Sequence, residues 1–171
     1  YVSLHLGYGL ALDNRPSEGI AMLEESVRLA EAKGFAARHS LRLAYVSEAY
    51  LLVDRLDDAF AAASRALALA TAHEERANEA YALRVLGEIE RRKGRMAEAE
   101  VQFESALKKA HELGMRPLQA HCERALAALL ERKQQSDRAM ALREGAAALA
   151  HSMGMRFWDE RFAGLDADEE I

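Results

Sequence analysis

The chain has almost none of the residues that interrupt helices or cross-link a fold: of its 171 residues, two are proline and one is cysteine. Pro16 and Pro117 fall where helices are expected to begin, a position at which the missing N–H has no cost. A single cysteine excludes an internal disulfide and favours a reducing cytoplasm. We expect Cys122 to be a small buried apolar side chain rather than a redox nucleophile.

Long apolar runs, period-two alternation and a large net charge are also missing. No stretch approaches the ~20 apolar residues of a membrane span, no signal peptide opens the chain, and no pattern is typical of strands. The 23 basic and 28 acidic residues give a net charge of -5, and four of the last six residues are acidic. We therefore expect no membrane partner and no direct nucleic-acid partner.

What the chain does contain is one pattern written four times, each copy offset by forty positions from the last and aligned without gaps. Repeats of this length are typical of solenoids, which hold other molecules on extended surfaces. We expect a single domain over 1–171, with repeats at about 1–40, 41–80, 81–120 and 121–160. The aligned columns are Gly19/Ala59/Ala99/Ala139, Ser26/Ala66/Ala106/Ala146, Ala30/Ala70/Ala110/Ala150 and Leu6/Val46/Leu86/Leu126.

Each repeat predicts an antiparallel pair of helices joined by a short turn. The first helices are expected at about 1–13, 36–53, 76–93 and 116–133, and the second helices at about 17–33, 56–73, 96–113 and 136–153. Gly34, Gly114 and Gly154 follow second helices, where a left-handed residue ends a helix well. The fold class is all-α: a right-handed α-solenoid of four pairs plus a capping helix at about 156–164.

The small-residue columns predict close crossings between helices, with the Leu6 column supplying bulk opposite them. Phe103 lies between Ala99 and Ala106 and is expected to be a core residue. A leucine at either alanine position would overpack the core.

These columns resemble the tetratricopeptide repeat (TPR) family. The third repeat matches best, because Ala99 and Ala106 follow Gly87 at the spacings of the family's motif. The chain departs from the family in three ways: the proline after the second helix is absent, Glu90 stands where a tyrosine is usual, and the period is 40 rather than 34. The matching positions are Leu83, Leu86, Gly87, Ala99, Phe103 and Ala106.

The long period resembles arrays in bacterial signalling proteins. Two stretches, 114–122 and 153–158, are similar to the C-terminal TPR regions of class III adenylate/guanylate cyclase-like ATPase proteins. LuxR-type activators with a maltose-activator-like solenoid are the other resemblance. Because the chain opens at Tyr1 inside an apolar-periodic segment, we expect a fragment of a larger protein that begins within a helix.

Nothing in the sequence predicts catalysis, a metal site or a cofactor. His73, His111 and His151 fall near the ends of second helices, where a histidine suits the helix dipole. No phosphate loop or nucleophile motif occurs. We therefore expect a non-enzymatic module, although the parent protein is a candidate nucleotide cyclase or ATPase.

The TPR resemblance implies that the first helices line a concave groove, apolar toward the N-terminus and rich in arginine toward the C-terminus. The expected ligand is a peptide or protein segment that is acidic or ends in a carboxylate, since arginine grips carboxylates with paired hydrogen bonds. The alternative is a solvated arginine face paired internally with Glu88 and Glu131. The candidate partner-binding residues are Tyr8, Glu48, Tyr81, Arg84, Glu88, Arg91, Arg92, Arg124 and Arg132.

The groove positions that the TPR resemblance implies also include apolar residues. These are Leu4, Ala11, Leu12, Leu41, Ala44, Leu51 and Leu52, with His121, Ala128 and Glu131 in the fourth repeat. An alternative is that the apolar N-terminal face covers further repeats.

Apolar side chains gather beyond the fourth repeat. We expect them to cap the array, ahead of an acidic tail; the alternative is a homodimer or partner interface. These residues are Met153, Met155, Phe157, Trp158 and Phe162.

Three functions follow from these expectations. The first is a protein-interaction scaffold or sensor in a bacterial signalling protein. The second is a segment that regulates a cyclase or ATPase through other domains of the parent chain. The third is a small-ligand-sensing solenoid of a transcription activator.

Overall fold

The computed structural model describes residues 2–34 and 38–154, and within these ranges it contains α-helices and no strand. The expected eight helices are all present, each bound lying close to its predicted position, so the all-α solenoid is confirmed. The ninth, capping helix falls outside the described residues. The helices are α1 (Val2–Leu12), α2 (Pro16–Ala32), α3 (His39–Leu52), α4 (Leu56–Ala72), α5 (Arg76–Arg92), α6 (Met96–Glu112), α7 (Arg116–Arg132) and α8 (Ser136–Ser152).

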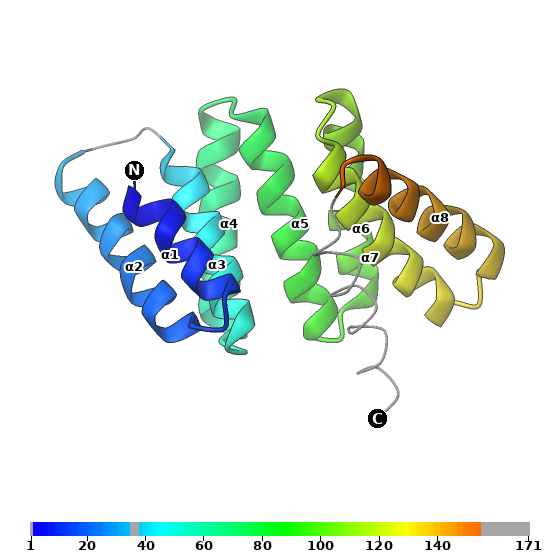
Figure 1. Cartoon of the computed structure of the whole chain (residues 1–171), viewed down its shortest axis with the longest axis horizontal. Helices are drawn as coiled ribbons and strands as arrows, with labels where there is room; N and C mark the ends of the chain where they lie inside the picture. The colour runs from blue at the N-terminus through cyan, green and yellow to red at the C-terminus, as the bar shows by residue number, and fades with distance from the viewer. Residues whose placement is uncertain (1, 35–37, 155–171) are drawn as a thin grey trace. The chain divides into compact units, whose positions relative to one another are not determined.

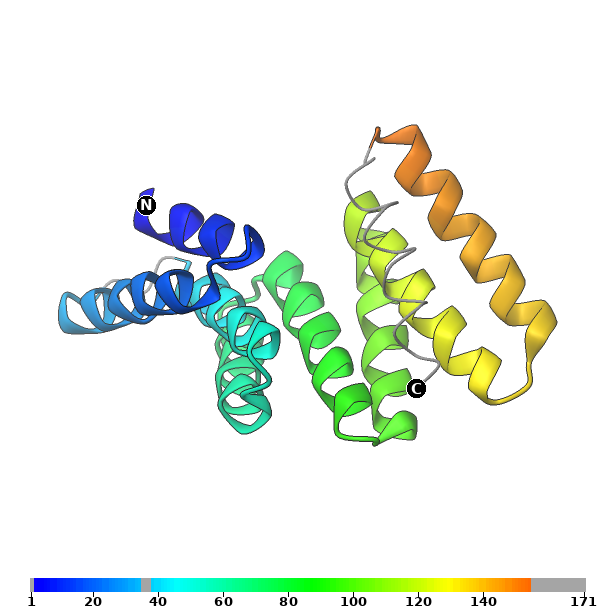
Figure 2. The same cartoon turned by 60° about the horizontal axis from the view of Figure 1, so that its bottom comes forward.

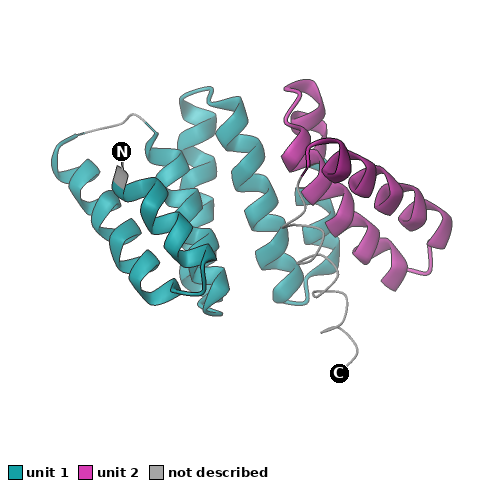
Figure 3. Cartoon of the chain, viewed as in Figure 1, with its two compact units in different colours: residues 1–106 teal, residues 107–171 magenta. Residues whose placement is uncertain are grey.

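The chain divides into two compact units, residues 1–106 and 107–171 (Figure 3). The expectation of one domain over 1–171 stays a prediction.

In the first unit, α1 and α3 each pack on the second helix of their own pair and on the first helix of the next pair (Figure 1). Thus α3 contacts both α1 and α5, while α2 contacts α3 and α4 contacts α5. The three first helices α1, α3 and α5 therefore share one face. In the second unit, α7 and α8 form an antiparallel pair (Figure 2).

The turns after the helices confirm the prediction that left-handed residues end them. The residues two positions past each helix end have a positive φ, whether or not they are glycine. A recurring backbone bond closes these turns, such as the one from the Glu75 N–H to the Ala70 carbonyl at 2.8 Å. This is the Schellman arrangement. The left-handed residues at these helix-ending turns are Asn14, Gly34, Asp54, Glu74, Gly94, Gly114, Gln134 and Gly154.

The first and second helices of a pair meet through complementary sizes. At Gly87, a Cβ would lie 2.8 Å from the Phe103 ring, and at Gly7 it would lie 3.1 Å from Leu23 Cγ. Phe103 and Leu23 are almost fully buried. A bulky side chain on the second helix thus requires a glycine on the first.

The Leu6 column is only partly confirmed. Val46, Leu86 and Leu126 are buried, but Leu6 is 50% exposed, so the expectation that Leu6 provides core bulk is wrong. Val46 is covered by α1 and α2, the preceding pair. The described residues supply no such pair ahead of α1.

We predict that Glu74→Gly and Gln134→Gly stabilise the fold by about 1 kcal/mol each, because a left-handed backbone costs a residue with a Cβ about that much. Chemical denaturation measures the change. His73→Gly is the matched control, since its φ is -103; it should not stabilise. Equal stabilisation by all three substitutions would show that the left-handed backbone at Glu74 and Gln134 is not the cause.

We predict that Gly87→Ala destabilises the protein by about 1–3 kcal/mol, because the added methyl group overlaps the Phe103 ring. Gly9→Ala is the control: nothing lies within 4 Å of its Cβ position, and alanine favours helix by up to about 1 kcal/mol. Melting curves should move in opposite directions for the two variants, and parallel shifts would refute the close contact.

Candidate functional site

A hydrogen-bonded network joins α1, α3 and α5 at one carboxylate. Glu48 Oε2 accepts the Tyr8 hydroxyl at 2.7 Å and also the Tyr81 hydroxyl, while Oε1 accepts Arg84 Nη2 at 2.7 Å. Each of these side chains comes from a first helix of a different repeat, except that Tyr81 and Arg84 share α5. The carboxylate is therefore the point at which three repeats are tied together.

Burial and neighbouring charges determine which groups of this network are protonated. The side chains of Arg84 and Glu48 are only 12% and 16% exposed. Burial would raise the pKa of Glu48, but the charge of Arg84 and the hydrogen bonds from Tyr81 and Tyr8 outweigh it and hold this pKa below its ordinary value. Burial and the Glu48 charge raise the pKa of Tyr8 and of Tyr81. Both phenols therefore stay protonated and donate.

An aromatic row accompanies the network. Tyr45 stacks on Tyr8, with ring centroids 4.1 Å apart, and meets the Tyr81 ring edge-on at 5.8 Å. The Arg84 guanidinium lies 4.9 Å from the centre of the Tyr81 ring. Tyr45 is not among the residues predicted from the sequence. Spacing along the chain could have revealed it, because Tyr8 to Tyr45 and Tyr45 to Tyr81 are each separated by one period less about one helical turn.

The end of α5 carries a second charged group. Glu88 accepts Arg91 Nη2 at 2.8 Å and Arg92 Nε at 3.3 Å, while Arg92 Nη1 donates to the Leu51 carbonyl at 2.7 Å. Burial would raise the pKa of Glu88, but Arg91 and Arg92 hold it below its ordinary value. Both guanidiniums contact the Glu88 carboxylate, and Asp54 Oδ1 lies 4.0 Å from Arg92 Nη1.

The predicted candidates therefore lie in three places. Tyr8, Glu48, Tyr81 and Arg84 are brought together, and Glu88, Arg91 and Arg92 form their own group in the same unit. The remaining two lie on α7 in the other unit, where Arg124 is half-buried and Arg132 is exposed.

Several apolar positions expected in the groove do not line a surface. Leu4, Ala11, Ala44 and Leu51 are almost fully buried, so their assignment to an open groove is wrong. Neighbouring repeats cover them: Leu4 and Ala11 pack with α2 and α3, and Leu51 packs with α4 and α5. The face is accordingly more polar than the sequence indicated.

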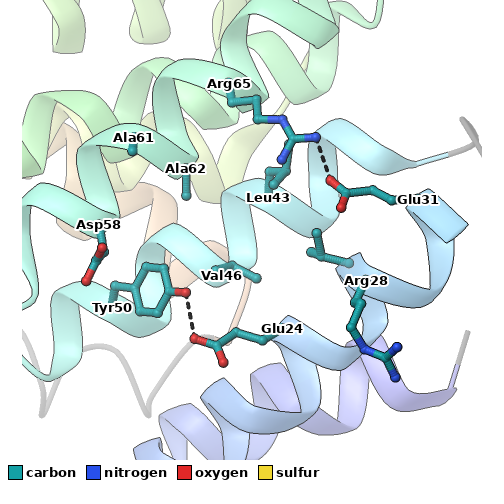
Figure 4. Close-up of a pocket in the computed structure, with 11 residues that line it drawn as sticks. Glu24, Arg28, Glu31, Leu43, Val46, Tyr50, Asp58, Ala61, Ala62 and Arg65 are labelled. Atoms are coloured by element: carbon teal, nitrogen blue, oxygen red, sulfur yellow. Dashed lines mark hydrogen bonds and ion pairs between the residues drawn. The ribbon is translucent and has the colours of Figure 1, made fainter.

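A cavity of about 500 Å³ opens on a different set of helices, α2, α3 and α4 (Figure 4). Its apolar lining includes Val27, Leu43, Val46 and Ala62, and the small side chains of Ala61 and Ala62 leave space on α4. The sequence analysis missed this site.

The charged lining of the cavity is paired internally. Tyr50 donates to Glu24 at 2.7 Å, and Arg65 Nη2 donates to Glu31 at 2.5 Å (Figure 4). Burial and the Glu24 contact raise the pKa of Tyr50 to about 12, so its hydroxyl remains a donor. Paired rim charges and an apolar interior suit an uncharged apolar group.

Histidine, cysteine and acidic side chains are the ones that could hold a metal ion. Across residues 2–34 and 38–154, no three His, Cys, Asp or Glu side chains are gathered so as to hold a metal ion. Cys122 is fully buried, as expected, and His73, His111 and His151 are exposed at helix ends. Within the same ranges, no helix has the length and apolar character needed to cross a membrane.

Comparison with known proteins identifies the fold. No protein-family model and no curated sequence matches the chain. Among solved structures, the crystal structure of MamA is 19% identical over 90% of this chain and 79% of that chain, with a TM-score of 0.61. A putative kinesin light chain from Podosopora anserina, with nearly identical TPR-like repeats, is 14% identical over 98% and 95%, with a TM-score of 0.59.

These likenesses concern the fold alone, because both sequence identities are low. The chain has the fold of a TPR-like repeat array, which agrees with the resemblance found in its columns.

We predict that Glu48→Gln lowers stability at neutral pH by about 3 kcal/mol, because it leaves Arg84 buried without a counter-charge. The folded pKa of Glu48 is depressed, so its contribution is present above the ordinary value of 4.5 and is lost as the pH falls through the folded pKa. Stability measured between pH 7 and pH 3 should therefore fall less steeply in the variant.

Glu98→Gln, at an exposed position of α6, is the control and should leave the acid limb of the profile as it is in the wild type. If the stability of Glu48→Gln falls between pH 7 and pH 3 as steeply as that of the wild type, protonation of Glu48 does not cause the loss of stability in acid.

Proposed function

We propose that this protein is a non-catalytic interaction module, a scaffold or sensor of a bacterial signalling protein, that binds a peptide or partner domain on the face formed by α1, α3 and α5. The Tyr8–Glu48–Tyr81–Arg84 network carries the proposal. It fixes aromatic and charged side chains from three successive repeats on one face, and such preorganised groups lose little entropy when they bind.

The roles within this face differ. Arg84 is 12% exposed and held by Glu48, whereas Arg91 and Arg92 are 25% and 33% exposed. Arg84, Glu48, Tyr8 and Tyr81 therefore act as positioning residues in the proposal. The arginines at the end of α5 make the contact with the partner.

The chemistry of the partner follows from the charge. Arg91 and Arg92 are partly exposed, and the proposal requires a partner carboxylate that their guanidiniums can bind with paired hydrogen bonds. An acidic or carboxylate-ended peptide, with an apolar residue against Tyr45, meets this requirement. Arg124 and Arg132 offer the same chemistry on α7.

The resemblance of residues 114–122 and 153–158 to cyclase-associated arrays supports a more specific form of the proposal. In it, the partner is another domain of the parent chain, and the module regulates a nucleotide cyclase or ATPase in the cytoplasm. Homodimer formation through the C-terminal apolar residues is the corresponding alternative to a cap.

Selection of a random-peptide library on the immobilised protein tests the face. We predict that the selected peptides carry acidic residues or a free C-terminal carboxylate beside an apolar residue. Replacing Arg91 and Arg92 by alanine should weaken the best peptide about tenfold or more, which is about 1.4 kcal/mol. Amidating the peptide terminus should weaken a carboxylate-ended ligand similarly.

Arg15→Ala is the matched control, since Arg15 precedes α2, lies outside the lining of the cavity and is paired with Glu18 at the surface. It should leave the affinity unchanged. Basic peptides, or full affinity in the Arg91/Arg92 variant, would rule the face out.

The cavity between α2, α3 and α4 favours a second candidate, sensing of a small apolar ligand, as in the activator-type solenoids. Its volume lies within the usual range of ligand sites, about 300–1,000 Å³. In the same experiment, loss of binding on Ala62→Phe but not on Arg91/Arg92 replacement would favour the cavity over the face.

A further inference from the structure

The cavity between α2, α3 and α4 belongs to one junction of the array, the contact of the first helix pair with the second. Val27 of α2 and Val46 of α3 line it. One period further along the chain, the same two columns hold Leu67 and Leu86, which pack in one cluster at the next junction of the first unit. The space therefore comes from smaller side chains at this junction and not from the repeat pattern itself.

The length of the cavity and the charges at its rim define the class of its ligand. Leu43 and Tyr50 line it along α3, and the seven residues between their positions rise about 10 Å. At the rim, Glu24 is bonded to Tyr50 and Glu31 to Arg65 (Figure 4). An uncharged compound with two linked rings suits this length and leaves both bonded pairs intact.

The two helices of the first pair are packed too closely to move separately. A Cβ added at Gly19 of α2 would lie 2.6 Å from the Gly7 carbonyl oxygen of α1. Leu23 of α2 in turn fills the space beside Gly7, 3.1 Å from its Cβ position. Because so dense a contact transmits displacement, a movement of α2 relative to α3 carries α1 with it.

This helix pair meets α3 on two sides. On one side, Val27 of α2 packs in one cluster with Val46 of α3 and lines the cavity. On the other side, Tyr8 of α1 donates to Glu48 at 2.7 Å and stacks on Tyr45. Tyr45 and Val46 are consecutive residues, so they lie on different faces of α3. The cavity and the hydrogen-bonded network are therefore two sides of one junction.

We propose that an uncharged apolar compound bound in this cavity keeps the Tyr8–Glu48 bond formed and thereby raises the affinity of the α1, α3 and α5 face for its partner. The open cavity and the intact network occur together in one arrangement. Without a ligand the apolar lining faces water, which favours movement of α2 into the space, and of α1 with it. A ligand that fits the cavity favours the arrangement in which the network is intact. The inference rests on the proposed roles of the face and the cavity, which become coupled sites.

The test uses N-phenyl-1-naphthylamine, an uncharged dye that fluoresces in apolar sites, together with a peptide selected on the immobilised protein. Saturating dye should tighten peptide binding about fivefold or more, and saturating peptide should tighten dye binding by the same factor, because coupling between sites is reciprocal. Ala62→Phe fills the cavity and should abolish both dye binding and the response of the peptide. Failure of the dye to bind the wild type would overturn the assigned ligand class.

Two matched variants test the connection through Tyr8. Tyr8→Phe keeps the ring but removes its bond to Glu48, so the dye should still bind while peptide affinity no longer responds to it. Tyr45→Phe removes the hydroxyl of the stacked ring and leaves the bond to Glu48 in place, so the response should persist. Equal responses in the two variants would overturn the proposal.

Amide hydrogen exchange separates this inference from the proposed function. The lining residues of the cavity belong to α2, α3 and α4, yet the dye should slow exchange in α1 of the wild type and of Tyr45→Phe, and much less in Tyr8→Phe. Slower exchange in α1 without any peptide binding would support the coupling and count against the face alone. Dye binding with no change in α1 would refute the coupling, whatever the face binds.

Discussion

Close backbone contact within each helix pair is the constraint on which the structure depends. The column Gly19/Ala59/Ala99/Ala139 is buried in every repeat. At Gly19 a Cβ would lie 2.6 Å from the Ala11 nitrogen and the Gly7 carbonyl oxygen. No larger side chain is compatible with that separation. Glycine or alanine in this column therefore allows the two helices of each pair to pack closely.

The same regularity sets where polar contacts between repeats occur. Ion pairs and hydrogen bonds recur at separations near one period: 36 residues for Glu48–Arg84, 34 for Glu31–Arg65 and 36 for Asp57–Lys93. The two separations of 36 residues are a period less about one helical turn, which brings side chains of adjacent helices level with each other. Patterns of opposite charge at this offset are therefore as informative as the columns themselves.

The helices could be predicted from the sequence because turns and periodicity are local. Gly34 and Asn14 mark helix ends through their own backbone preferences, and neighbouring repeats do not alter them. The candidate face was less predictable. The columns placed Tyr8, Glu48 and Tyr81 on first helices correctly, but whether a residue there is surface or core depends on what the adjacent repeat presents. Leu4 is buried and Leu6 is exposed for this reason.

The arginine face shows the same dependence. Internal pairing was one of two interpretations open from the sequence, and it applies to Arg91 and Arg92 through Glu88. Glu131 instead pairs with Arg143 on α8 at 2.6 Å. Spacing along one helix predicted the first pair, whereas the second joins two helices and depends on their packing.

The shared carboxylate of Glu48 has a consequence for how the first unit comes apart. Solenoids ordinarily fray from an end, one repeat at a time, because each repeat touches only its neighbours. Here a side chain of the second repeat bonds simultaneously to the first and third. Loss of α1 removes the hydrogen bond that Tyr8 donates to the buried Glu48 carboxylate. Because the same carboxylate pairs with Arg84, loss of the outermost helix also weakens the contact between α3 and α5. The network thereby links three repeats into one cooperative block, with a sharper opening transition than independent repeats would have.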